Sequence, residues 1–167
     1  GCIYIEKGKL NVENCTFSGD AGTYKESASY MGADKFVAKA ANGSHINAGS
    51  GVGVLTITNS TFENSKSTFG AVYAANTSLT VKNSTFTNNG NGLQLDNKEG
   101  IFDISDCTFS GGTKAINATR GTKMTLNVKD SSFSDFKGGS VINANGNTNI
   151  AGGSFNENNA GSNGIVQ

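Results

Sequence analysis

The residues that could do chemistry are few and scattered along the chain. His45 is the only histidine and Arg120 the only arginine, and Asp96, Glu99 and Asp103 come closest to an acidic group. Glycoside hydrolysis needs two carboxylates at a set separation, and calcium needs several oxygen ligands together. Neighbouring repeats carry no acidic partner at matching positions, so we expect no catalytic residue, no metal site and no cofactor. A lone histidine is most often a solvated or hydrogen-bonded surface residue, and we expect Arg120 to be a solvated loop charge.

The three cysteines, Cys2, Cys15 and Cys107, lack the Cys-x-x-Cys spacing of a metal site. Cys15 and Cys107 occupy one position of the repeat described below, four repeats apart, which is roughly 19 Å at a strand spacing of ~4.8 Å. A disulfide needs Cα atoms within about 7 Å, so these two cannot pair within one chain. Three states stay open: a bond between Cys2 and Cys15, an intermolecular bond through Cys2, and buried free thiols.

Composition excludes several function classes. The 167 residues carry 13 basic and 13 acidic side chains, scattered singly, so no positive stripe is available for nucleic acid. No hydrophobic run is long enough to span a bilayer. The sequence starts at Gly1 without an initiator methionine, so we expect a processed or excised segment. Gly, Asn, Ser and Thr make up nearly half of the chain, a balance typical of disorder unless a repeat builds a thin, shared core.

Such a repeat is present, because an aliphatic residue is followed five positions later by phenylalanine seven times. The pairs are Val12 with Phe17, Met31 with Phe36, Ile57 with Phe62, Val81 with Phe86, Ile104 with Phe109, Val128 with Phe133 and Ile150 with Phe155. A short strand of alternating apolar and polar residues, such as Val72-Tyr73-Ala74, lies upstream of each pair. The sequence predicts an all-β fold in which one domain, residues 1–167, forms a single-stranded parallel β-helix of about seven coils of ~23 residues, with a partial coil at 164–167.

The tight turn between the aliphatic residue and the phenylalanine is the best-specified part of a coil. Asn14, Asn59 and Asn83 share one position with Asp106 and Asp130, and these residue types tolerate a left-handed backbone. We expect their side chains to hydrogen-bond along the stack and the phenylalanines to form an internal ladder. Asn42, Asn76 and Asn117 head glycosylation sequons in what we read as looser turns, which makes them the better candidates for sugar attachment.

The repeats resemble those of a known family. The segment Leu79-Thr80-Val81-Lys82-Asn83-Ser84-Thr85-Phe86-Thr87-Asn88-Asn89 and the segment Gly138-Gly139-Ser140-Val141-Ile142 are similar to the right-handed parallel β-helix repeats of microbial adhesin-like and polymorphic outer-membrane-type surface proteins. The resemblance implies a right-handed coil and an extracellular or cell-surface protein without enzymatic activity. The alternative is a pectin lyase-like protein that binds or degrades polysaccharide, since the same fold hosts such enzymes.

The two ends of the predicted helix and its irregular turns are the candidate interaction surfaces. Both ends read as the first strand of a coil, which predicts either a slice of a longer β-helical stalk or end-to-end stacking into a filament through Cys2, Ile3, Tyr4, Ile165 and Val166. The partners are therefore copies of the chain or a continuation of the helix, with a host or matrix glycan or protein as a further possibility. The irregular stretches 24–31 and 37–43 either carry a binding surface or cap the stack.

Overall fold

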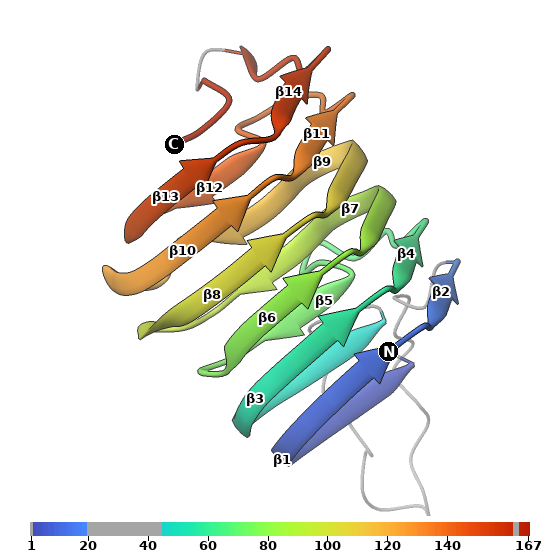
Figure 1. Cartoon of the computed structure of the whole chain (residues 1–167), viewed down its shortest axis with the longest axis vertical. Coiled ribbons are helices and arrows are strands. Elements are labelled where there is room, and N and C mark those ends of the chain that lie inside the picture. The colour runs from blue at the N-terminus through green and yellow to red at the C-terminus, as the bar shows by residue number, and fades with distance from the viewer. Residues whose placement is uncertain (1, 20–44, 162–163) are drawn as a thin grey trace, which may run out of the picture.

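A computed structural model describes residues 2–19, 45–161 and 164–167, and fourteen strands are found in them (Figure 1). All pairings between the strands are parallel. The strands are β1 (Ile3–Glu13), β2 (Thr16–Ser18), β3 (Ile46–Thr58), β4 (Thr61–Glu63), β5 (Val72–Ala74), β6 (Ser78–Lys82), β7 (Thr85–Leu95), β8 (Glu99–Ser105), β9 (Thr108–Ala118), β10 (Lys123–Lys129), β11 (Ser132–Ser134), β12 (Ile142–Ala144), β13 (Asn147–Ala151) and β14 (Ser154–Asn156).

The strands form three faces, each a stack in which a strand pairs with its equivalent one coil away (Figure 1). Face one consists of residues 3–5 of β1, 46–48 of β3, β5, 93–95 of β7, 116–118 of β9, and β12. Face two consists of residues 9–13 of β1, 54–58 of β3, β6, β8, β10 and β13. Face three consists of β2, β4, residues 85–87 of β7, 108–110 of β9, β11 and β14. The predicted all-β parallel β-helix is confirmed.

The coil count differs from the prediction. Phe17 pairs directly with Phe62, and the two rings lie 4.9 Å apart, so no strand stands between the coils that carry them. Met31 and Phe36, the pair expected to define a coil at this place, lie outside the described residues. Faces two and three therefore have six strands each, which make about five turns, whereas the sequence predicted about seven coils.

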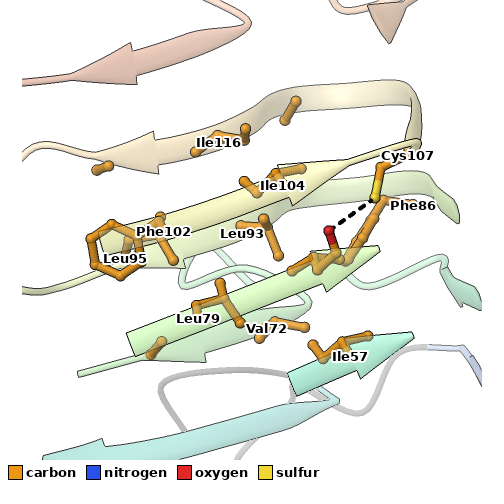
Figure 2. Packing of buried hydrophobic residues seen from close by; sticks show 14 of the residues in the cluster. Ile57, Val72, Leu79, Phe86, Leu93, Leu95, Phe102, Ile104, Cys107 and Ile116 are labelled. Carbon is orange, nitrogen blue, oxygen red and sulfur yellow. Dashed lines mark hydrogen bonds between the residues drawn. The ribbon is translucent and has the colours of Figure 1, made fainter. Parts of the chain in front are cut away.

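The core is a set of inward columns that each coil extends by one residue. Face two contributes two columns, and all their side chains are at most 2% exposed. One column contains Leu55, Leu79, Phe102 and Leu126, and the next contains Ile57, Val81, Ile104 and Val128. Figure 2 shows how these side chains interdigitate with those of face one, such as Val72, Leu93 and Ile116. Burying each contributes at most about 1.5–3 kcal/mol, so stability comes from repetition of a thin layer.

Face three contributes a continuous aromatic ladder. Six phenylalanines stack in sequence with centroid separations of 4.9, 4.8, 4.7, 5.2 and 4.8 Å and interplanar angles of 5–11°. They are Phe17, Phe62, Phe86, Phe109, Phe133 and Phe155. Offset aromatic pairs at such distances add about 0.5–1.5 kcal/mol each beyond the area they bury. The ladder therefore joins each coil that carries one of these rings to the next.

Each phenylalanine strand is bounded by two left-handed residues. The first lies three positions before the phenylalanine and is Asn14, Asn59, Asn83, Asp106, Asp130 or Gly152, with φ between 47° and 70°. The second lies two positions after it and is Gly19, Asn64, Asn88, Gly111, Asp135 or Glu157, with φ between 52° and 94°. Left-handed backbone is tolerated best by Gly, Asn and Asp, which explains the residue types at both corners. The sequence pattern predicted the first corner, and no prediction was made for the second.

The polar ladder beside the first corner is built by the next residue, not by the asparagine side chains. The backbone N–H of Cys15 donates to Ser60 Oγ at 3.2 Å, that of Ser60 to Ser84 Oγ at 3.2 Å, and that of Cys107 to Ser131 Oγ at 3.1 Å. Among the described hydrogen bonds, none involves the side chains of the corner asparagines. Hydroxyls in this column therefore satisfy buried amides that the tight corner leaves without a ladder partner.

Of the three states left open by the sequence, the structure shows free thiols and no bond between Cys2 and Cys15, while an intermolecular bond through Cys2 stays a prediction. Cys2 and Cys15 are exposed. Cys107 takes a serine position in the column, and its thiol donates to Ser105 O at 3.0 Å and to Val81 O at 3.7 Å (Figure 2). Burial raises the pKa of Cys107 to about 11, so the thiol stays protonated and unreactive at neutral pH. Three coil steps separate Cys15 from Cys107, one fewer than predicted, because the coil of Phe17 stacks directly on the coil of Phe62.

Candidate functional site

Tyr73, Asp96 and Arg120 meet just past the end of face one, and they come from three successive coils. Tyr73 lies in β5, Asp96 directly follows β7, and Arg120 follows β9. The Tyr73 hydroxyl donates to Asp96 Oδ2 at 2.7 Å, and Arg120 Nε lies 2.6 Å from Asp96 Oδ1 in an ion pair. The carboxylate side chain is 9% exposed and the guanidinium side chain 71%. A buried charge therefore joins three coils. Arg120 is an exposed loop residue as expected, but its ion pair with Asp96 was not predicted.

The electrostatics of this group keep Tyr73 neutral. Burial, and then the hydrogen bond and negative charge of Asp96, raise the pKa of Tyr73 to about 12, while the positive charge of Arg120 opposes the rise. Tyr73 thus remains a hydroxyl donor throughout the physiological range. An uncompensated buried carboxylate would be costly, so Arg120 and Tyr73 are the groups that allow Asp96 to lie here. The arrangement holds coils together, because Oδ2 of Asp96 accepts the hydroxyl of Tyr73 and Oδ1 lies in an ion pair with Arg120.

Other outward polar side chains also bond to their equivalents one coil away. On face one, Asn117 Nδ2 donates to Gln94 Oε1 at 2.7 Å. On face two, Asn127 Nδ2 donates to Asp103 Oδ1 at 2.8 Å, and Asn149 Nδ2 donates to Asn127 Oδ1 at 2.9 Å. Such cross-strand pairs contribute about 0.2–1 kcal/mol each. In every one of these pairs the later coil donates to the earlier one.

Face three repeats this pattern with hydroxyls. Ser110 Oγ donates to Thr87 Oγ1 at 3.4 Å, and Ser132 Oγ donates to Thr108 Oγ1 at 3.3 Å. Hydroxyl pairs directly opposite one another across neighbouring strands are among the pairs that stabilise a sheet. Side chains on all three faces therefore contribute to the stacking of the coils.

The Phe-x-x-Asn motif has a structural role that its sequence did not reveal. Asn89 Nδ2 donates to the carbonyl of Phe62 at 2.9 Å, and its Oδ1 accepts the backbone N–H of Ser65 at 3.0 Å. Asn158 makes the same two bonds one coil back, to the carbonyl of Phe133 at 3.0 Å and from the N–H of Phe136 at 3.1 Å. Each asparagine therefore brackets the corner of the preceding coil. The spacing of three after a ladder phenylalanine was the available signal.

His45 is buried, which contradicts its expected place on the surface. It is 0% exposed, and its ring lies against Phe17 and Phe62, with centroids 5.9 and 6.0 Å away. Its Nε2 lies 3.1 Å from the carbonyl oxygen of Gly19. Sequence reasoning missed this because Gly19 and His45 are separated by 26 residues. Burial lowers the pKa of His45, chiefly by removing water from the charged form.

The predicted assembly residues lie at opposite ends of the stack (Figure 1). Ile3 of the first coil pairs with Ile46 of the second, and its neighbour Tyr4 is 66% exposed. Ile165 and Val166 add one rung to face one beyond β12: the N–H of Val141 donates to Ile165 O at 2.8 Å, and Val166 bridges to Ile142. No described strand pairs with the outer edge of β13 or β14. Face one thus has one more rung than faces two and three.

The three candidate glycosylation sites have different fates. Asn42 lies outside the described residues. Asn76 is exposed in a turn, with a left-handed φ of 51°. Asn117 lies within β9 and not in the looser turn we expected, and its side-chain nitrogen, the atom that would carry a sugar, is bonded to Gln94. Of these three candidates, Asn76 is the one whose described side chain is exposed and free of hydrogen bonds.

The remaining chemistry-bearing residues are dispersed. Glu99 begins β8 and is exposed, and Asp103 belongs to the amide ladder of face two. Over residues 2–19, 45–161 and 164–167, no three His, Cys, Asp or Glu side chains are grouped in a way that could hold a metal ion. In the same ranges there is no helix long and apolar enough to cross a membrane.

Comparison with known proteins places this architecture. The model of the family described as right handed beta helix region matches residues 1–160. No curated protein and no solved structure matches the chain.

Proposed function

The chain belongs to the right-handed β-helix family, and from this membership we propose that it is a stretch of a non-enzymatic structural stalk on the outside of a cell. One observation carries the proposal: the polar side chains on the faces bond to their equivalents in the next coil. Asp103, Asn127 and Gln94, which could have formed a ligand site, are engaged in this way. Asp96 is bonded to Tyr73 one coil earlier and paired with Arg120 one coil later. Surface side chains that bond neighbouring coils to each other support a long and stiff rod.

The repeating layers suit a mechanical role. Interior strands of every face are paired on both sides, and the phenylalanine ladder and the serine column repeat the same contacts at each step. In a solenoid, stability is close to a sum of coil terms and nearest-neighbour terms, so length can grow without a larger core. A polypeptide of this kind projects a distal part away from its anchor at little cost in sequence complexity.

An adhesive role is an extension of the same proposal. Stretches 24–31 and 37–43, which lie outside the described residues, interrupt the repeat between the first two coils, and insertions in solenoids often carry the binding face. Their deletion would reduce saturable attachment to a host or matrix glycan or protein while leaving the stalk intact. Unchanged attachment would confine the role of the segment to that of a spacer.

The test of the stalk is protein shaving of intact cells of the producing organism. Brief protease treatment, followed by mass spectrometry of the released peptides, should recover peptides of this chain from intact cells. A cytoplasmic marker protein and lysed cells provide the two controls. Recovery only after lysis would refute an extracellular stalk.

A further inference from the structure

His45 forms part of the joint between the first and second coils. Its ring lies against Phe17 of the first coil, at an interplanar angle of 29°, and against Phe62 of the second, at 33°. Its backbone carbonyl accepts the N–H of Ile3 at 2.8 Å, and its side chain reaches the carbonyl of Gly19. One residue therefore contacts both ends of the first coil, the start of β1 and the residue after β2.

The bond to Gly19 fixes the tautomer of the ring. A backbone carbonyl can only accept, so Nε2 carries the hydrogen, and in a neutral imidazole Nδ1 is then the unprotonated nitrogen. Within the described part of the chain, Nδ1 is buried and has no hydrogen-bond partner. A proton added to His45 must therefore go to Nδ1, into a site with no described acceptor and beside two phenylalanine rings. Such a buried charge is strongly unfavourable.

The charges around the ring do not compensate for burial. Removal from water is the largest influence and lowers the pKa of His45, whereas the bond to Gly19 and the carboxylate of Glu63 in β4 raise it. The unfolded chain binds a proton at His45 near the ordinary value of 6.5, while the folded chain binds it only at lower pH. Folding stability contributed by neutral His45 is thus present above pH 6.5 and is lost as pH falls below it.

We propose that His45 makes the joint between the first and second coils acid-sensitive, so that mild acidification releases the first coil from the stack while the later coils stay folded. His45 is the only histidine, and histidine is the side chain whose ordinary pKa lies between pH 5 and pH 7.5. A change of local stability in that range is therefore assignable to one side chain. The property belongs to this junction, because Ala71 and Ala115 take the place of His45 in later coils.

The test combines two NMR measurements on the full chain. Titration of the single imidazole gives the folded-state pKa directly, which should lie below 6.5. Hydrogen exchange at pH 7.5 and pH 5.0 then compares the amide of Thr61, bonded to Cys15 O at 2.8 Å across the joint, with that of Ser132, bonded to Cys107 O at 2.8 Å in later coils. The Thr61 protection factor should fall by up to about 30-fold, tenfold per pH unit below 6.5, and the Ser132 factor should not change.

Two variants separate titration from structure. His45→Phe keeps an aromatic ring against Phe17 and Phe62, and His45→Gln keeps a side-chain donor for Gly19; neither can titrate. Thr61 protection should be independent of pH in whichever variant folds. An imidazole pKa at or above 6.5, which is the result expected if attraction between the cation and the aromatic faces prevails, would overturn the proposal. So would an equal loss of Thr61 protection in wild type and variants.

Discussion

Replacing Asn89 by alanine should destabilise the protein more than its small change in volume suggests. Asn89 is 2% exposed and makes two bonds to backbone groups of the preceding coil, one to the carbonyl of Phe62 and one from the N–H of Ser65. Alanine can make neither bond, because its side chain has no polar atom. Both backbone groups would then be buried and unsatisfied.

The magnitude follows from counting these groups. Each buried polar group left without a partner costs about 1–3 kcal/mol, so the variant should lose about 2–6 kcal/mol. A typical domain is stabilised by about 5–15 kcal/mol, so a loss of this size in the free energy of unfolding is easily measured. Asn158 provides a matched control, because it makes the same pair of bonds in the last coil but is only half-buried, where water can substitute. Asn158→Ala should cost less than about 1 kcal/mol.

Urea unfolding followed by circular dichroism is the assay. With a slope of about 2 kcal/mol per M, a loss of 3 kcal/mol lowers the midpoint by about 1.5 M. Asn89→Asp is a sharper probe, because a carboxylate can still accept from Ser65 but cannot donate to the carbonyl of Phe62, and it should be destabilised as well. A loss below 0.5 kcal/mol for Asn89→Ala, or equal losses at Asn89 and Asn158, would refute the bracket as a determinant of stability.

Three further changes test other parts of the account. Asp96→Asn should lower the pKa of Tyr73 from about 12 toward 10, with burial keeping it above 10, as measured by the ultraviolet absorbance of tyrosinate; an unchanged pKa would contradict the contact. Phe109→Ala should cost about 3–5 kcal/mol in thermal unfolding and Phe155→Ala less than half as much, since Phe155 is half-buried with one ring neighbour; equal costs would argue against a cooperative ladder. Glu157→Asn should stabilise by about 0.5–1 kcal/mol, because asparagine tolerates the left-handed φ of 52° better; a lower melting temperature would be the contrary result.

The β-helix was predictable because its determinants repeat at a fixed spacing. Each coil carries an inward aliphatic residue, a corner residue and a phenylalanine at the same spacing. An irregular residue in one coil therefore does not obscure the pattern that the other coils share. The pair of Met31 and Phe36 shows the limit of this reasoning, because Phe17 stacks directly on Phe62 and the predicted coil count is therefore too high. The residues three positions before and two positions after Phe36 in the sequence are Ala33 and Ala38, whereas 11 of the 12 corners in the described coils are Gly, Asn or Asp. Alanine disfavours the left-handed backbone that those corners adopt, so the phenylalanine spacing alone was an incomplete signal.

The candidate site was harder to predict, because it depends on contacts between positions that do not repeat. Asp96 and Arg120 each occur once at their position in the coil, and their pairing is set by turns that the pattern does not describe. His45 was expected on the surface because a lone histidine is most often a solvated or hydrogen-bonded surface residue. Its burial results from the close approach of Gly19, which follows from the direct stacking of Phe17 on Phe62.

Cryo-electron microscopy of the protein isolated from its native source tests the stalk most directly. In a continuous stalk, a further coil should stack on β13 and β14. Its ring should continue the phenylalanine ladder beyond Phe155, and its strand on face two should be connected to the rung at Val166. Strand spacing of ~4.8 Å should run unbroken across this position. Outer edges of β13 and β14 that face solvent, or that are covered by an element other than a coil, would contradict the proposal that this chain is a stretch of a continuous β-helical stalk.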